Sequence, residues 1–224
     1  MLVAPDAGLA YWFPRSAIRR ESLLRNAAET IRPGGVVWDV GANMGLFSLA
    51  AAGLSGPTGR VYAFEPDTDM VKLIRRSAQL NPQAAPVQII PCAISDTISL
   101  AQFNIANNNR AANFLEGFGT GLTGGVREVQ SVLTVSLDWL AERIPPPDVL
   151  KIDVEGAELC VFRGAAQLLK AKRPVVLFET QGCNGEEISR VLLGLGYTLY
   201  DCDRTPAERQ PLVRPAFNTL AIPA

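Results

Sequence analysis

The stretch that decides the fold is Asp39-Val40-Gly41-Ala42-Asn43-Met44-Gly45, which follows the apolar run Val36-Val37-Trp38. A short run that is almost entirely apolar is typical of a strand covered on both faces of a sheet. Glycines make the turn after such a strand tight, and a missing side chain lets a ligand approach the backbone. The residues from Leu46 to Ala52 continue as an alanine-rich helix. We therefore expect a strand, a ligand-binding turn and a helix.

The alternation of strand and helix continues along the chain. Strands are expected at 61–64, 87–90, 149–152 and 175–178, helices at about 19–31, 67–81, 157–170 and 186–195, and terminal strands near Tyr197 and Asn218. This order predicts a parallel sheet with helices on both faces. The rhythm breaks between residues 97 and 136, where β-like segments at 98–103 and 129–135 flank a polar, glycine-rich loop. We predict a doubly wound α/β domain over residues 33–224, preceded by a short N-terminal helical extension over residues 1–32.

Composition narrows the function. The chain has 224 residues, is 48% hydrophobic and carries a net charge of -1, so it can bury a sizeable core and lacks the cationic excess of nucleic-acid-binding proteins. It contains no histidine, which excludes Ser/His/Asp triads and histidine-ligated zinc. The sequence contains no uncharged apolar run of about 18 residues, so we expect no transmembrane helix. Four scattered cysteines and no basic leader favour a reduced, cytoplasmic protein.

The glycine turn is shaped for a ligand without a pyrophosphate. Aligned on Gly41, the dinucleotide fingerprint needs glycines at positions 43 and 46, where this chain has Asn43 and Leu46. The second strand ends in Glu65, where an acidic residue accepts hydrogen bonds from ribose hydroxyls. Together these features indicate a nucleoside without a diphosphate, of which S-adenosylmethionine is the obvious candidate. The alternative is that the glycines only close a tight turn and Glu65 caps the next helix.

The end of the third strand supplies a further part of this site. Asp96 could reach an adenine amino group, with Ala93 and Ile94 against the ring. The alternative is an aspartate that is solvated in a turn.

The sequence resembles class I methyltransferases and, more narrowly, the FkbM family. The resemblance rests on residues 39–45, on Ala63-Phe64-Glu65-Pro66, on Ala93-Ile94-Ser95-Asp96 and, most firmly, on Leu150-Lys151-Ile152-Asp153-Val154-Glu155-Gly156-Ala157-Glu158. It implies a Rossmann-like sheet of seven strands, mostly parallel with the last antiparallel. It also implies methyl transfer from S-adenosylmethionine to an oxygen, often a hydroxyl of a sugar, glycoconjugate or polyketide. On this resemblance the cofactor-binding residues are Asp39, Gly41, Ala42, Asn43, Gly45, Glu65, Pro66, Ala93, Ile94, Asp96 and Asp153.

Without histidine, the candidate catalytic groups are carboxylates. Asp153 and Glu179 close neighbouring strands at the edge where open α/β sheets bind ligands, and Glu155 can point into the same crevice. One of them could act as a base, or Asp153 and Glu179 could hold Mg²⁺ and acidify a diol. Lys151 faces the same side as Asp153, as a structural ion pair or as a catalytic lysine. Glu158 could instead complement a helix dipole.

Three functions compete at this point. An O-methyltransferase acting on a small-molecule or glycan acceptor is favoured. A non-catalytic S-adenosylmethionine-binding domain and a nicotinamide-dependent oxidoreductase are the alternatives. Residues 104–127, rich in glycine and asparagine, are expected to form a mobile lid or acceptor-binding loop. Tyr11-Trp12-Phe13 are expected in the core or over the acceptor site.

Overall fold

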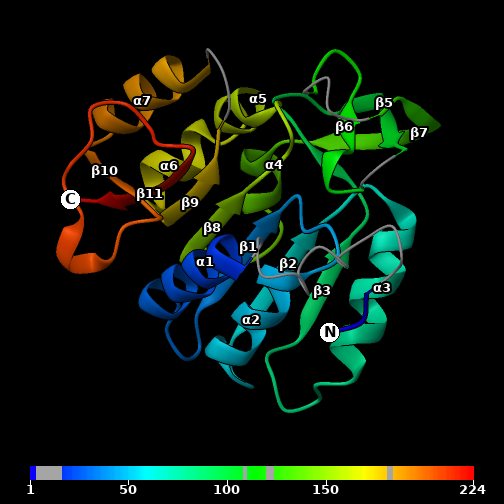
Figure 1. Cartoon of the computed structure of the whole chain (residues 1–224), viewed down its shortest axis with the longest axis horizontal. Coiled ribbons are helices and arrows are strands. Elements are labelled where there is room, and N and C mark those ends of the chain that lie inside the picture. The colour runs from blue at the N-terminus through cyan, green and yellow to red at the C-terminus, as the bar shows by residue number, and fades with distance from the viewer. Residues whose placement is uncertain (4–16, 108–109, 120–123, 181–183) are drawn as a thin grey trace.

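The computed structural model of the chain describes residues 1–3, 17–107, 110–119, 124–180 and 184–224. Its centre is a seven-stranded sheet (Figure 1). The strands, in spatial order, are β10 (Tyr197–Asp201), β11 (Asn218–Pro223), β9 (Val175–Glu179), β8 (Val149–Ile152), β1 (Val36–Val40), β2 (Arg60–Phe64) and β3 (Val87–Ile90). β11 runs antiparallel to both of its neighbours, and the other pairs are parallel. The predicted mostly parallel sheet with an antiparallel last strand is confirmed.

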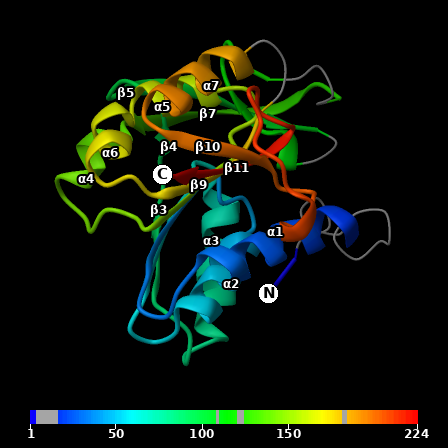
Figure 2. The same cartoon turned by 90° about the vertical axis from the view of Figure 1, so that its left-hand side faces the viewer.

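Helices cover both faces of this sheet, as Figure 2 shows. One face carries α1 (Ala17–Thr30), α2 (Leu46–Ser55) and α3 (Thr68–Gln79). The other carries α4 (Leu137–Ala141), α5 (Glu158–Arg163), α6 (Ala166–Ala171) and α7 (Gly185–Gly194). The helix expected over 157–170 is two helices. At the break, a Cβ on Gly164 would overlap the carbonyl oxygen of Ser95, so the chain passes too closely there for a side chain.

The apolar strands build a core on each side of the sheet. Successive side chains of a strand point to opposite faces, so Val37 packs with α1 and α2 while Trp38 packs with α4 to α7. All four residues of β8 are buried. This double burial explains the continuous apolar runs on which the sequence prediction rested.

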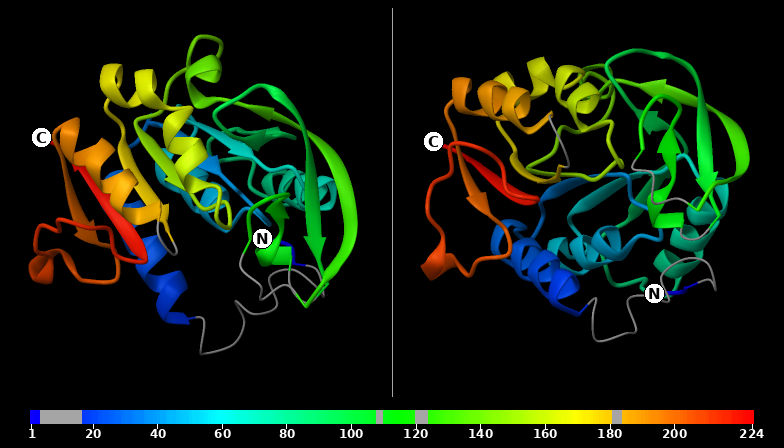
Figure 3. Two further views of the ribbon diagram at one scale, coloured as in Figure 1. Left: turned by 90° about the horizontal axis from the view of Figure 1, so that it is seen from above. Right: turned by 45° about the horizontal axis from the view of Figure 1, so that its top comes forward.

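A second sheet fills the break in the rhythm, and its two long strands confirm the β-like segments expected at 98–103 and 129–135. Its strands, in spatial order, are β4 (Ala93–Ile94), β7 (Val126–Val135), β5 (Ser99–Ala106) and β6 (Phe114–Leu115). β5 and β7 form a long antiparallel ribbon that curves beside α3 (Figure 3). Between β5 and β6 lies a short 3₁₀ helix, η3 (Arg110–Ala112). Residues 104–106, 114–115 and 126–127 are therefore strand rather than loop, which corrects the bounds of the expected lid.

The helix expected at about 19–31 is present as α1, and it packs against the domain. Ala27 and Ile31 are buried among residues of α2 and the sheet. Polar contacts join α1 to the C-terminal region: Ser22 Oγ donates to Asp203 Oδ1 over 2.8 Å, and Asn26 Nδ2 donates to the carbonyl of Cys202 over 2.9 Å. No helix among the described residues is long and apolar enough to cross a membrane. Tyr11-Trp12-Phe13 and Cys183 lie outside the described residues.

Candidate active site

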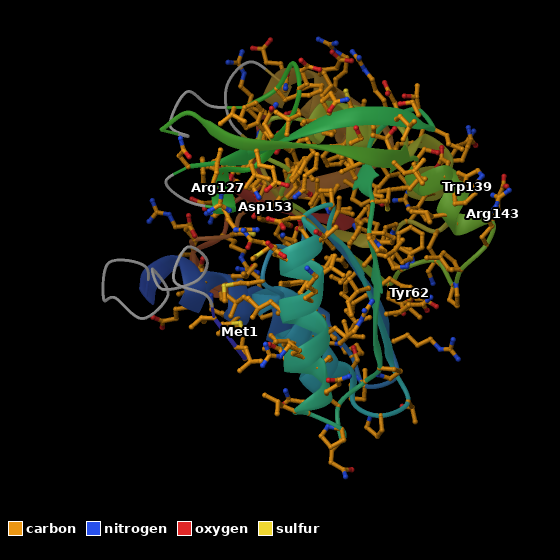
Figure 4. All side chains as sticks on the ribbon, turned by 90° about the vertical axis from the view of Figure 1, so that its right-hand side faces the viewer. Met1, Tyr62, Arg127, Trp139, Arg143 and Asp153 are labelled. Atoms are coloured by element: carbon orange, nitrogen blue, oxygen red, sulfur yellow. The ribbon has the colours of Figure 1, made fainter. Side chains whose placement is uncertain are left out.

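A cavity of about 340 Å³ opens at the carboxyl ends of the central parallel strands. Among the residues that the sequence singled out, it is lined by Gly41, Ala42, Asn43, Glu65, Pro66, Ala93, Ile94, Lys151, Asp153, Glu155 and Glu179. Asp39, Gly45 and Asp96 do not line it. Figure 4 shows Asp153 in this region, between the β5–β7 ribbon and the start of α3 in that view. Residues from four separate strand ends thus meet in one hollow.

The glycine turn needs glycine for a reason that lies within the protein itself. Gly41 has φ +71°, and a Cβ there would overlap the carbonyl oxygen of Asp153 on the neighbouring strand end. Gly45, at the start of α2, has φ +87° and packs against Ile74. Asn43 is also left-handed, with φ +50°. The turn therefore takes this shape because two strand ends pass at backbone contact, before any ligand is considered.

Glu65 is buried beside this turn and holds two backbone groups. Its Oε2 accepts from the N–H of Asn43 over 2.6 Å, and its Oε1 accepts from the N–H of Asp67 over 2.8 Å. Burial raises the pKa of Glu65 to about 7. A carboxylate has about four lone-pair sites, so two remain for a ligand. Glu65 does not cap α3, because that place is taken by Asp67, whose carboxylate accepts from the N–H groups of Asp69 and Met70.

Lys151 ties the ends of β1 and β8 together. Its Nζ donates to the carbonyl oxygen of Gly41 over 2.8 Å and lies 3.2 Å from Asp39 Oδ1 and 3.6 Å from Asp153 Oδ2. Asp39 is fully buried and accepts from Ser48 Oγ over 2.5 Å. Asp39 thus lies outside the cavity lining and is connected to it by its ion pair with Lys151. The expected pairing of Lys151 with Asp153 is present.

Three carboxylates gather at the other side of the cavity. Burial, together with the charges of Asp153 and Glu179, raises the pKa of Glu155 to about 8. Glu155 has φ +53°, a conformation that costs an ordinary residue energy and that often marks functional sites. Glu158 plays a different part: its Oε1 accepts from the N–H groups of Val154 and Gly156 and closes the turn that presents Glu155.

Two predicted details stand differently in the structure. Ala93 and Ile94 line the cavity, but Asp96 is exposed and accepts a hydrogen bond from Ser95 Oγ over 3.3 Å. A role for Asp96 at the adenine stays a prediction. The described residues contain no group of three or more His, Cys, Asp or Glu side chains arranged to hold a metal ion. A role for Asp153 and Glu179 as Mg²⁺ ligands stays a prediction.

Two walls of the cavity contain residues that the sequence did not single out, although part of the first lies in the segment expected as a lid or acceptor-binding loop. One is the inserted sheet, through Phe103, Arg110, Asn113 and Leu115. The other is α1, through Ser22, Leu23 and Asn26. Arg110 could have been recognised as a candidate site residue from the sequence, because it is the one charged residue between Thr97 and Leu115. The contribution of α1 depends on contacts across about 180 residues, and no local pattern announces it.

The fold and the cavity together define a class: a doubly wound domain of the Rossmann-like methyltransferase type, with its site at the carboxyl edge of the sheet. Comparison with known proteins narrows this class. The model of the methyltransferase FkbM domain matches residues 39–199, so the chain belongs to the FkbM methyltransferase family.

Several relatives illustrate the similarity. The 31-O-demethyl-FK506 methyltransferase FkbM of Streptomyces tacrolimicus is 29% identical, over 92% of this chain and 86% of that protein. The hexuronic acid methyltransferase AglP of Haloferax volcanii is 27% identical, over 81% of this chain and 71% of that protein. The crystal structure of methyltransferase FkbM from Methylobacillus flagellatus has a TM-score of 0.54 at 13% identity, over 92% of this chain. This chain spans 58% of the length of that structure, so the likeness supports the fold.

Proposed function

We propose that the protein transfers a methyl group from S-adenosylmethionine to a hydroxyl oxygen of a small molecule or glycan. One observation carries this proposal: a single cavity joins the glycine turn and Glu65 on one side to Asp153, Glu155 and Glu179 on the other. The first group suits a nucleoside, and the second suits proton removal. Family membership favours methyl transfer over the nicotinamide-dependent alternative.

The cofactor half of the site is the turn with the end of β2. The backbone around Gly41 and Asn43 admits a ligand closely, and the remaining lone pairs of Glu65 suit ribose hydroxyls. Ala93 and Ile94 offer an apolar surface for the base. The bound cofactor supplies an electrophilic methyl group on a sulfonium. The protein has to hold that methyl in line with the acceptor oxygen, and such orientation can supply ~7–11 kcal/mol in favourable systems.

The proton of the acceptor hydroxyl goes, in this proposal, to Glu155. A base works best when its pKa lies near the working pH, and burial brings the pKa of Glu155 to about 8. Asp153 is held by Lys151 and orients the acceptor beside it. Lys151 itself is engaged by three oxygen-bearing groups and acts in positioning and in offsetting charge rather than as a base.

The acceptor class follows from the relatives' names and from the site. AglP is named as a hexuronic acid methyltransferase, and the Streptomyces relative as a methyltransferase of 31-O-demethyl-FK506. For this chain we propose a hydroxyl of a sugar, glycoconjugate or polyketide-type compound, and no nucleic acid, given the net charge of -1. We write the reaction with a carboxylate base and without Mg²⁺.

The experiment is a turnover assay with trideuteromethyl-labelled S-adenosylmethionine and panels of glycans, free sugars and macrolides. Mass spectrometry should detect a deuterated methyl ether that survives alkali. A product that alkali hydrolyses, which is a methyl ester, would contradict hydroxyl methylation. Glu155→Gln should abolish product, while Glu142→Gln, a surface control just after α4, should leave it unchanged.

A further inference from the structure

The inserted sheet is joined to the proposed ribose-binding carboxylate through a single side chain. Asp67 follows Glu65 by two residues and gives its N–H to Glu65 Oε1. The Asp67 carboxylate is fully buried. It accepts from Arg110 Nη1 at both oxygens, over 2.9 and 2.7 Å, and from Asn113 Nδ2 over 3.1 Å.

Arg110 is fixed from a second direction as well. Its Nη2 donates to Asp69 Oδ2 over 3.1 Å, and the side chain is 10% exposed. Lys72 and Arg110 together lower the pKa of Asp69, which keeps the second partner ionised. A guanidinium held by two carboxylates has little freedom, so its position is set before any ligand binds. Asn113 is fixed likewise, because its Oδ1 accepts from the N–H of Ala106 over 2.9 Å.

Both residues also face the cavity. Arg110, Asn113, Phe103 and Leu115 line it, together with Ala93 and Ile94 of the same sheet. The strand order decides which half they enclose. β2 and β3 lie on one side of β1, whereas β8 and β9, which carry the three carboxylates, lie on the other. Because Asp67 follows β2, the Arg110 wall stands on the side of Glu65.

We propose that Arg110 and Asn113 form the wall of the adenosine half of the cofactor site, held there by Asp67. The inference rests on the proposed function, since it takes the cavity to bind S-adenosylmethionine. It gives the insertion a different role from the expected acceptor-binding loop. The described part of residues 104–127 encloses the nucleoside, and the acceptor enters from the side of β8, β9 and α1.

The test uses two ligands that share the adenosine. S-Adenosylhomocysteine contains the amino-acid portion, and 5′-methylthioadenosine lacks it. Titration calorimetry should show that Arg110→Gln weakens both ligands by the same factor, roughly ten-fold or more for a lost charged contact. Asp67→Asn should weaken both as well, and its effect should not add to that of Arg110→Gln, because the two act as one unit. Arg163→Gln, which breaks an exposed ion pair with Glu187, is the matched control and should bind both ligands normally.

Each outcome decides the inference. Loss of affinity for S-adenosylhomocysteine alone would place Arg110 at the other half of the cofactor and overturn the proposal, as would normal binding of both ligands. Arg110→Gln leaves a buried carboxylate with a lost partner and can unfold the protein. If Arg110→Gln does not fold, the double variant Asp67→Asn with Arg110→Gln, which removes both charges, is tested in the same titrations and should likewise bind both ligands more weakly. If the wild type binds neither ligand, the proposed function itself is contradicted. If the wild type binds both ligands and the variant binds them equally well, only the inference about Arg110 is contradicted.

Discussion

Replacement of Glu65 by glutamine tests the cofactor half of the site. The carboxylate accepts one backbone N–H at each oxygen, from Asn43 and from Asp67. Glutamine has one acceptor oxygen and one amide donor, so one of these N–H groups would face a donor. The lost hydrogen bond to a charged acceptor costs about 1.5–3 kcal/mol of folding stability. A loss of the same size, about 1.5–3 kcal/mol, for the hydrogen bond to the ribose corresponds to roughly 10- to 150-fold weaker binding of the cofactor.

The assay is calorimetric titration with S-adenosylhomocysteine at two pH values, with a thermal melt to follow folding. The pKa of Glu65 is raised to about 7, and ribose hydroxyls favour the ionised carboxylate. Wild-type affinity should therefore rise as the pH increases from 6 to 8, and Glu65→Gln should lose this dependence. A folded Glu65→Gln protein that binds S-adenosylhomocysteine as tightly as the wild type at pH 8 would refute the assignment.

Three further predictions follow from the same contacts. Gly41→Ala should lower the free energy of unfolding by about 2 kcal/mol or more in a denaturant melt, because a Cβ at φ +71° would overlap the Asp153 carbonyl oxygen. The control Gly53→Ala, with open space around the added Cβ, should be neutral or stabilising in the same assay. Asp153→Asn and Glu155→Gln should each cut kcat by orders of magnitude while S-adenosylhomocysteine binding changes by a few fold at most, and EDTA should leave wild-type turnover intact; activity lost to EDTA and restored by Mg²⁺ would contradict the carboxylate base. Glu155 has a folded-state pKa of about 8 against an ordinary 4.5, so the folded state retains a proton that the unfolded state loses, and this contribution to stability disappears as the pH rises from about 4.5 through 8. The melting temperature should fall less steeply over that range in Glu155→Gln than in the wild type, and equal slopes would argue against the raised pKa.

The central sheet could be predicted because its signals are local. Five short apolar runs, four of them followed by a turn and a helix, indicate a doubly wound sheet almost without further information. The helix expected at about 67–81 is present as α3, with Asp67 as its N-cap. The residues at the strand ends met in one cavity because parallel strands end at the same edge.

The two long strands of the inserted sheet could be expected from their β-like composition, but their pairing and their buried polar contacts could not, because these depend on residues far apart in the chain. Asn104, Asn113 and Arg110 read as a polar loop, yet Asn104 and Asn113 are buried and Arg110 pairs with Asp67 across 43 positions of the chain. A polar residue with a distant buried partner looks the same in sequence as a solvated one. The same holds for α1, whose wall depends on Asp203 and Cys202 near the other end of the chain.

The reason given for Gly41 also changed with the structure. From the sequence, we expected the missing side chain at Gly41 to leave space for a ligand. The structure shows that Asp153 occupies the position of a Cβ, so substitution there acts on folding first. Glu65, whose side chain lines the cavity, is therefore the better probe of binding.

The most direct test of the central claim is a pair of calorimetric titrations of the wild-type protein, one with S-adenosylmethionine and one with NAD. The account predicts one S-adenosylmethionine bound per chain with micromolar affinity and no heat from NAD, because Asn43 and Leu46 replace the glycines that a pyrophosphate requires. Binding of NAD in place of S-adenosylmethionine, or no binding of S-adenosylmethionine by the folded protein, would contradict it.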